Sequence, residues 1–135
     1  MPRLNHANLP VADVAALRDF FVRHFGFRVL ATRGQDGFVV LEGDGGFILN
    51  LMRHRPREGN GFPESFHVGF HLDTPDAVRA KHAELAAAAI VVGEVADLVR
   101  GGWASTTFYC HAPNDLLVRW GAGEPRSRRA ARRVA

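Results

Sequence analysis

The sequence predicts an α+β fold in which one βαβββ module occurs twice. Three features support this: short segments that alternate apolar and polar residues, two helical segments that each follow an N-capping residue, and a match between the two halves at an offset of 61 residues. We expect the modules, residues 1–55 and 64–123, to form a curved, partly open eight-stranded sheet with the helices on its outer face. They would make up one domain, residues 1–125, followed by a basic, disordered tail at residues 126–135.

The first half of the chain contains one strand, one helix and three further strands by these signals. The first strand is predicted over residues 3–11, and Asp13 is the expected N-cap of a helix over residues 14–25 that ends at Gly26. Turns rich in glycine and aspartate separate the three short strands that follow, over residues 27–33, 37–43 and 46–54.

The same order of elements returns after a linker rich in proline and glycine. A strand is predicted over residues 66–73, and Thr74 with Pro75 is the expected start of a helix that reaches residue 89. Three more strands are predicted, over residues 90–99, 102–110 and 116–122.

The positions of two histidines indicate that the modules are copies of one unit. His6 lies seven residues before the helix cap Asp13, and His67 lies seven residues before the cap Thr74. A repeated spacing of strand, cap and helix is expected of an internal repeat.

The composition is that of an ordinary globular protein, with 47% hydrophobic and 23% charged residues in a chain of 135. No apolar segment approaches the about 20 residues that a membrane-spanning helix requires. The first residues lack the layout of a signal peptide, and a single cysteine, Cys110, excludes an internal disulfide. We therefore expect a cytoplasmic protein with no membrane partner.

The positive charge of the chain belongs to its last ten residues. The net charge is +3, from 17 basic and 14 acidic residues. Residues 126–135 contain five arginines and no acid, which leaves 12 basic against 14 acidic residues, or −2, in the rest. Contact of this tail with nucleic acid or an acidic partner is one alternative, but we favour a solvated end and expect no nucleic-acid partner.

Polar residues gather on the strand faces that point away from the predicted core. Successive side chains of a strand point to opposite sides, so in the segment 66–73 the histidines share one face and the apolar residues the other. The same alternation gives the candidate ligand-binding set: His6, Asn8, Asn50, Met52, His54, His67, His71 and Arg119. A solvated face would carry lysine, glutamate, threonine and serine, so this set indicates an enclosed polar pocket for a small molecule.

Other residues receive lesser roles. Phe38, Phe62 and Trp103 are candidate apolar contacts for the ligand. We expect no site role for the surface histidines His24 and His82, which lie on helices, or for His111 at a turn. Because neighbouring strand residues face opposite ways, Cys110 beside His111 does not indicate a thiolate nucleophile.

Two βαβββ modules with a histidine in each first strand resemble the vicinal oxygen chelate superfamily. Its members include glyoxalase I, extradiol dioxygenases, fosfomycin-modifying transferases and bleomycin-resistance binding proteins. The resemblance covers residues 3–121 and rests on the order and spacing of four motifs: LNHANLPVADV, FGFRV, FHVGFHLD and FYCHAPNDLLVRW. It implies a homodimer.

The resemblance also implies which residues stand at the metal-ligand positions. In the metalloenzymes of this superfamily a histidine or glutamate from each paired strand holds a divalent cation. His6 and His67 match two of these positions, Asn50 matches a position that is glutamate in glyoxalase I, and Arg119 matches the glutamate of the last strand. A metal site generally needs three protein ligands, and a guanidinium repels a dication.

We therefore expect a metal-independent binding protein of the glyoxalase/bleomycin-resistance type, with no cofactor. It would hold a polar or anionic small molecule on the concave sheet face, where Arg119 offers a planar fork for a carboxylate or phosphate. The alternative is a lyase, thiol transferase or dioxygenase that uses Zn, Ni, Mn or Fe held by His6 and His67. No catalytic residue follows from the sequence.

Overall fold

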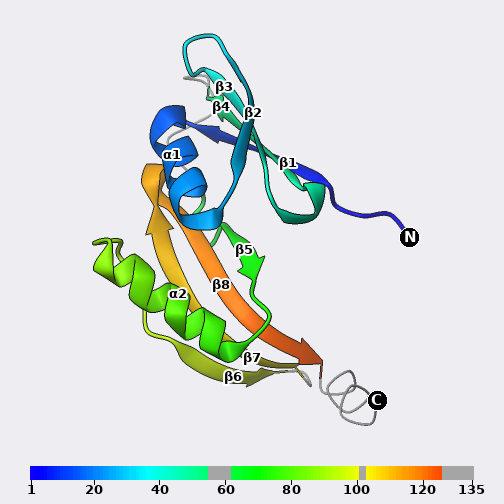
Figure 1. The fold of residues 1–135 in the computed structure, drawn as a ribbon, viewed down its shortest axis with the longest axis vertical. Helices are drawn as coiled ribbons and strands as arrows, with labels where there is room; N and C mark the ends of the chain where they lie inside the picture. Colours follow the sequence, from blue (N-terminus) through cyan, green and yellow to red (C-terminus); the bar gives the residue numbers. More distant parts are fainter. Residues whose placement is uncertain (55–61, 101–102, 126–135) are drawn as a thin grey trace. The chain divides into compact units, whose positions relative to one another are not determined.

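The computed structural model describes residues 1–54, 62–100 and 103–125 and divides the chain into two compact units. One unit comprises Met1–Pro63 with Ala112–Asp115, and the other comprises Glu64–His111 with the residues from Leu116 onward. Each unit holds a helix and four strands in the order βαβββ, and the strands form two open four-stranded sheets (Figure 1). The α+β class and the two predicted modules are confirmed.

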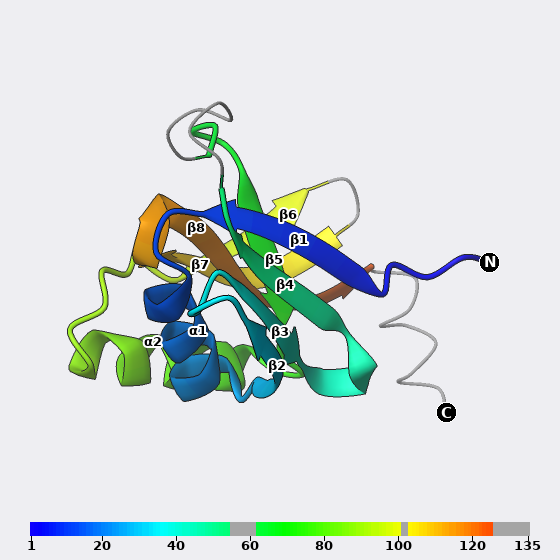
Figure 2. The same cartoon turned by 90° about the horizontal axis from the view of Figure 1, so that it is seen from above.

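The first unit is a mixed sheet with one helix against it. Its elements are β1 (His6–Val11), α1 (Val14–Phe25), β2 (Arg28–Arg33), β3 (Phe38–Glu42) and β4 (Ile48–Arg53). The strand order is β1-β4-β3-β2, with β1 parallel to β4 and the other pairs antiparallel. Figure 2 shows β1 and β4 side by side. Because α1 contacts β2, β3 and β4, it covers one face of the sheet and leaves the other for a site.

The predicted ends of α1 are confirmed. The Asp13 side chain accepts a hydrogen bond from the Ala16 N–H at 3.0 Å, which satisfies one of the free donors of the first turn. Gly26 ends the helix with a φ of 69°, a left-handed conformation that glycine adopts without steric cost.

The core of the first unit lies between α1 and the sheet. Alternate residues of β1, β3 and β4 are buried there, as the period-two pattern predicts. The helix and strand residues that are almost fully buried are Leu9, Val11, Val14, Leu17, Phe20, Phe21, Val39, Leu41, Leu49 and Leu51.

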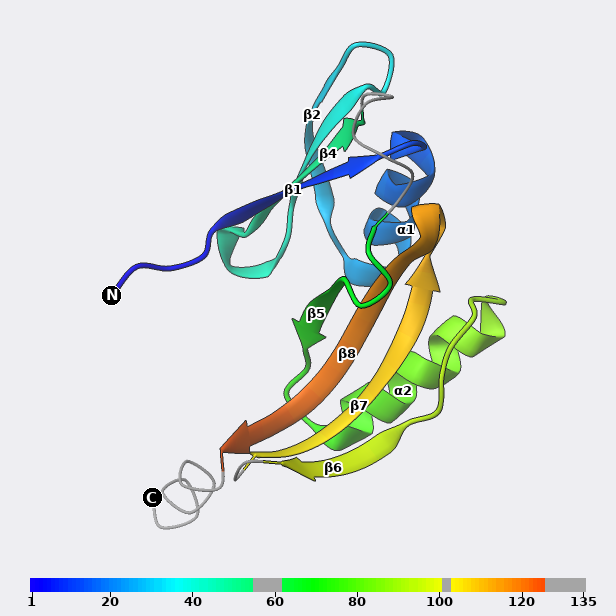
Figure 3. The same cartoon turned by 180° about the vertical axis from the view of Figure 1, so that it is seen from behind.

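The second unit repeats this plan. Its elements are β5 (His67–His71), α2 (Pro75–Ala87), β6 (Ala96–Arg100), β7 (Trp103–Ala112) and β8 (Leu116–Pro125). The strand order is β5-β8-β7-β6, with β5 parallel to β8 and α2 packed along the sheet (Figure 3). Thr74 caps α2 by accepting a hydrogen bond from the Ala77 N–H at 3.1 Å, and Pro75 occupies its first turn, as predicted.

Two boundaries in the second unit differ from the prediction. The strand expected over 90–99 begins only at Ala96, and an isolated bridge between Val92 and Cys110 is the one pairing before it in the described chain. The Gly93 carbonyl accepts a hydrogen bond from the His82 ring at 2.8 Å, so this backbone segment is tied to α2. The helix ends at Ala87 rather than at residue 89 because Ala89 has a φ of 61°.

Asn114 attaches the turn between β7 and β8 to the start of α1. Its Oδ1 accepts a hydrogen bond from the Asp13 N–H, and its Nδ2 donates to the Asp13 carbonyl, both at 2.8 Å. Asn114 has a φ of 66°, which asparagine tolerates better than most residues. These two bonds explain why the turn belongs to the first unit although both flanking strands belong to the second.

The stability of the second unit should depend on the charge of Asp97. Its carboxylate on β6 accepts a hydrogen bond from the Thr106 hydroxyl at 2.6 Å and pairs with Arg79 of α2 at 3.1 Å. The Thr106 bond, aided by Arg79, lowers the pKa of Asp97 below its ordinary value of 3.8. The carboxylate therefore stabilises the fold above that value, and the contribution is lost as the pH falls through the lower folded pKa.

Asp97→Asn should accordingly lose less stability than the unaltered protein when the pH is lowered from about 5 to about 3. Urea unfolding followed by circular dichroism across this range measures the difference. Replacing the exposed Glu94 by glutamine is the matched control, and equal acid sensitivity of all three proteins would contradict the prediction.

In the described part of the chain, neither helix is long and apolar enough to cross a membrane. The predicted basic tail, residues 126–135, lies outside the described residues.

Candidate functional site

The uncovered face of the first sheet carries five of the predicted site residues. His6 and Asn8 are exposed on β1, and Asn50, Met52 and His54 are partly exposed on β4 or just beyond it. The residues that alternate with them point into the core, so these strands present the faces that alternation predicts. Ligand binding by these side chains stays a prediction.

Two asparagines join β1 to β4 on this face. Asn8 lies directly opposite Asn50, and Asn50 Nδ2 donates a hydrogen bond to Asn8 Oδ1 at 2.7 Å. The bond occupies one amide donor and one amide acceptor, so the pair retains further hydrogen-bonding capacity for a polar ligand.

Glu42 is an acid on the same face that the sequence reasoning missed. It lies opposite Ile48 on β4, which in turn lies opposite His6 on β1. Two strand spacings put the Glu42 and His6 backbones about 10 Å apart, and the Glu42 carboxylate is bonded to the Arg28 guanidinium. Glu42 is therefore engaged in an ion pair in this structure.

The uncovered face of the second sheet carries the other three predicted residues. His67 and His71 are exposed on β5, with Gly69 between them. Arg119 of β8 lies opposite Gly69 in the register and is partly exposed. The absence of a side chain at Gly69 leaves the strand surface beside Arg119 open to a ligand.

Arg119 borders an open hollow of about 200 Å³ whose lining includes His71, Ser105 and Gly121. Its guanidinium lies over Gly121, where a Cβ atom would come within 3.4 Å of Nη1. The Arg119 guanidinium forms no hydrogen bond or ion pair with any other residue that the structure describes. Its N–H donors are therefore available for a carboxylate or phosphate.

Tyr109 of β7 adds an aromatic group that the sequence reasoning did not name. Tyr109 is 38% exposed, and its ring meets the His67 ring edge-on, with centroids 5.6 Å apart. The signal was present in the alternation of the segment 105–110, because the neighbours Phe108 and Cys110 are buried on the opposite face.

In both His6 and His67, Nδ1 contacts an oxygen atom of a nearby residue and Nε2 is left for other interactions. Nδ1 of His6 is 2.7 Å from Asn5 Oδ1, and Nδ1 of His67 is 3.1 Å from the Ser65 carbonyl. Both oxygens are acceptors, so in the neutral ring Nδ1 carries the proton and Nε2 keeps its lone pair. Each histidine can thus accept a hydrogen bond, a proton or a metal through Nε2.

Within the described residues, no three His, Cys, Asp or Glu side chains gather closely enough to hold a metal ion. The predicted residues divide between the two sheets, five on the first and three on the second. Their assembly into one site stays a prediction.

The histidines excluded from the site have packing roles. His24 is buried, not on the surface as expected, with its ring 5.1 Å from that of Phe20. The His82 ring forms a hydrogen bond with the Gly93 carbonyl, and its centroid lies 5.0 Å from that of the Phe108 ring. Of the candidate apolar contacts, Phe38 is partly buried on β3, and the Trp103 side chain lies outside what the structure describes.

Cys110 should be unreactive in the folded protein. Its side chain is fully buried, while the neighbouring His111 is exposed. Burial raises the pKa of the Cys110 thiol and so disfavours the nucleophilic thiolate. We expect a disulfide reagent such as DTNB to modify it at least about tenfold more slowly in the native protein than in guanidinium. Equal rates would contradict the burial.

The fold and the site define a class of protein: two βαβββ modules that leave one polar face on each sheet. The family model described as Glyoxalase/Bleomycin resistance protein/Dioxygenase superfamily matches residues 3–118, and the chain belongs to this superfamily. No protein of curated function has a sequence that matches this chain significantly.

Solved structures agree with this assignment. A possible glyoxalase from Bacillus cereus is 31% identical, with a TM-score of 0.72 over 87% of this chain and 96% of its own. A fosfomycin resistance protein from Listeria monocytogenes is 16% identical, with a TM-score of 0.71 over 93% of this chain and 98% of its own. A lactoylglutathione lyase from Agrobacterium tumefaciens is 18% identical, with a TM-score of 0.70 over 89% and 92%. The last two show the fold alone.

Proposed function

We propose that this protein binds a small anionic molecule on the polar face of its second sheet and needs no metal. The observation that carries the proposal is the Arg119 guanidinium, which borders a hollow lined in part by glycine and has no partner among the described residues. A carboxylate or phosphate accepts two parallel hydrogen bonds from a guanidinium. His71 and Ser105, which line the same hollow, offer further donors.

The chemistry of the donor set supports binding without a metal. Arg119 stands where the resemblance implies a glutamate ligand, and two unit charges about 4 Å apart interact by about 4 kcal/mol at an effective dielectric of about 20. A dication doubles that repulsion. The remaining groups at the implied positions are His6, His67 and Asn50. They bring two histidine ligands, one fewer than the three protein ligands that a metal site generally needs, which supports binding without a metal.

The Nε2 lone pairs of His6 and His67 favour one alternative, a lyase, thiol transferase or dioxygenase that uses Zn, Ni, Mn or Fe. A lactoylglutathione lyase and a fosfomycin resistance protein are among the proteins of similar fold. This alternative needs a third protein ligand besides the two histidines.

Calorimetric titration with phosphonoacetate tests the anion site. We expect saturable binding that Arg119→Gln weakens at least about tenfold, because a hydrogen bond to a charged group contributes about 1.5–3 kcal/mol. Arg33→Gln, on the edge strand β2, is the matched control and should leave the affinity unchanged.

Metal analysis of protein purified without chelators separates the two candidate functions. The proposal expects no stoichiometric metal. Stoichiometric Zn, Ni, Mn or Fe that is lost on His67→Ala would refute it in favour of the metalloenzyme. We also propose a homodimer, for which light scattering should give twice the 14.8 kDa of one chain.

A further inference from the structure

The uncovered face of the first sheet carries a pair of amides with apolar neighbours. The register puts Asn8, Asn50 and Val40 in one row across β1, β4 and β3, so their side chains share this face. Ile48 and Met52 of β4 lie in the adjoining rows on the same face, because residues two apart in a strand point the same way. Asn8 is exposed, and the other four residues are half-buried. The two amides therefore have apolar side chains beside them on β3 and β4.

The amide pair leaves a hydrogen-bond donor next to an acceptor. Asn50 Nδ2 donates to Asn8 Oδ1 at 2.7 Å, and within the described chain neither side chain forms a further hydrogen bond. Asn8 Nδ2 therefore keeps its N–H donors, and Asn50 Oδ1 keeps its lone pairs. Turning both amides over would reverse the bond and would still leave one donor beside one acceptor. Adjacent strands lie about 4.8 Å apart, so one small molecule can reach both groups.

A donor next to an acceptor matches a ligand group that has the two in the opposite order. A lactam is such a group, because its ring holds the N–H and the C=O on the same side of the amide bond. The peptide bond is almost always trans, which turns its N–H and C=O to opposite sides. The pair therefore matches a cyclic amide better than a peptide.

The charged side chains that the structure describes on this face lie away from the pair. Glu42 and Arg28 share the row of His6, and their charges are joined in an ion pair. Arg33 lies on the edge strand β2, about 10 Å from β4 at the backbone. Burial of a charge without a partner is costly. These surroundings therefore favour a neutral ligand.

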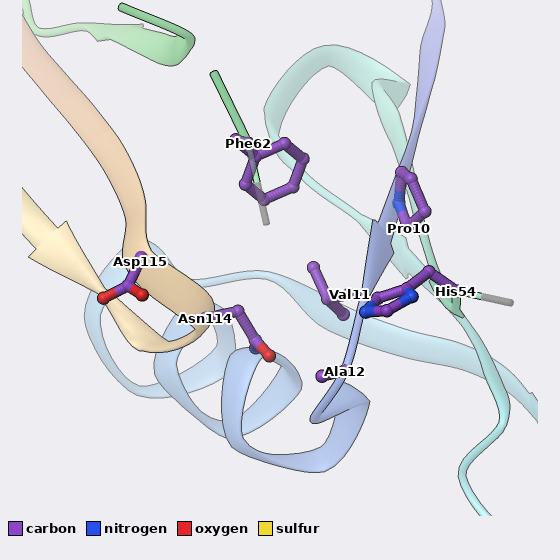
Figure 4. Close-up of a pocket in the computed structure, with 7 residues that line it drawn as sticks. All are labelled: Pro10, Val11, Ala12, His54, Phe62, Asn114 and Asp115. Carbon is purple, nitrogen blue, oxygen red and sulfur yellow. The ribbon is translucent and has the colours of Figure 1, made fainter. Parts of the chain in front are cut away.

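The ends of β1 and β4 border an open hollow of about 240 Å³ (Figure 4). Pro10, which lies opposite Met52, and His54 are among the residues that line it. Figure 4 shows the Asp115 carboxylate turned away from His54. At this end of the face, the described part of the hollow therefore directs no carboxylate toward the strands.

We propose that the Asn8–Asn50 pair binds a small neutral lactam. The N–H and C=O of the lactam bond to the two amides, and its ring lies on the apolar side chains of Val40, Ile48 and Met52. A flat ring suits this surface, since methionine adapts its shape to a ring and makes favourable sulfur–aromatic contacts. The proposal is independent of the anion site at Arg119, because the first unit supplies every residue on which it depends.

Three small molecules separate the contributions of the amide and the ring. In ¹⁵N-resolved NMR titrations of the full chain, α-pyridone at millimolar concentration should shift the side-chain amide signals of Asn8 and Asn50 in a saturable way. Its N-methyl derivative keeps the ring but has no N–H donor, and it should bind at least about fivefold more weakly. Acetamide keeps the amide but has no ring, and it should also bind at least about fivefold more weakly.

Two variants locate the binding. Asn8→Asp keeps an oxygen that accepts the bond from Asn50 Nδ2 but has no donor for the lactam carbonyl, and it should weaken α-pyridone binding at least about fivefold. Asn50→Leu removes the acceptor and should have an effect of the same size. Asn5→Asp makes the matched change three residues earlier and should leave the affinity unchanged. Arg119→Gln should also bind α-pyridone as the unaltered protein does.

Three results would overturn the proposal: no saturable shift with α-pyridone, equal affinity for α-pyridone and its N-methyl derivative, or unchanged affinity in both Asn8→Asp and Asn50→Leu. Equal affinity for acetamide would overturn the contact between the ring and the apolar side chains. None of these results bears on phosphonoacetate binding at Arg119, so failure here is distinguishable from failure of the anion site.

Discussion

Arg119→Glu should abolish phosphonoacetate binding and create affinity for a divalent metal. The change removes the guanidinium that we assign to the anion and puts a carboxylate at the position where the superfamily's metalloenzymes carry glutamate. The local charge changes by two units, which at a separation of about 4 Å and an effective dielectric of about 20 corresponds to many kcal/mol for a dication. We expect Zn²⁺ affinity to rise at least about a hundredfold, measured by competition with a chromogenic chelator.

Two further variants define what the metal result means. Arg119→Gln should lose the anion without gaining the metal, because it brings no negative charge. His67→Ala combined with Arg119→Glu should lose most of the gained affinity, because it removes the Nε2 ligand. If Arg119→Glu still bound phosphonoacetate as the unaltered protein does, Arg119 would not be the anion's anchor.

Phe21→Ala should cause the largest loss of stability among single substitutions in the first unit. The Phe21 ring is fully buried and contacts Phe25 and Phe27 at centroid distances of 4.8 and 5.5 Å. Truncation of a buried phenylalanine costs about 3–5 kcal/mol through lost transfer energy and the cavity that remains. Urea unfolding followed by tryptophan fluorescence and circular dichroism measures the change.

The neighbour of Phe21 provides its control. Val22 is 41% exposed on the same helix, so Val22→Ala should change stability by less than about 0.5 kcal/mol. If Phe21→Ala lowered the free energy of unfolding by less than about 1 kcal/mol, this would contradict the packing of Phe21 in the core between α1 and the first sheet.

The site could be predicted in part. The alternation of apolar and polar residues on β1, β4, β5 and β8 identified which side chains point away from the core, because residues two apart in a strand share a face. Tyr109 and Ser105 on β7 were not identified, because the alternation was not used to assign the two faces of that strand. The alternation also did not indicate that Glu42 pairs with Arg28, because the pair depends on the register between β2 and β3.

Local signals in the sequence predicted the two modules and the starts of their helices. Asp13 and Thr74 cap α1 and α2 through bonds to amides three residues away, and such local signals can be read along the chain. The predicted strand over 90–99 was wrong at its start, where a hydrogen bond from His82 to Gly93 outweighs the local strand preference of the segment.

Which of these residues contact one another depends on the tertiary structure. The register of β5 against β8 sets Arg119 beside Gly69. Two hydrogen bonds between Asn114 and Asp13 join residues that are 101 positions apart. Contacts of this kind depend on cross-strand register and chain reversal, which are non-local and leave no periodic trace in the sequence. The hollow at Arg119 is a product of such contacts.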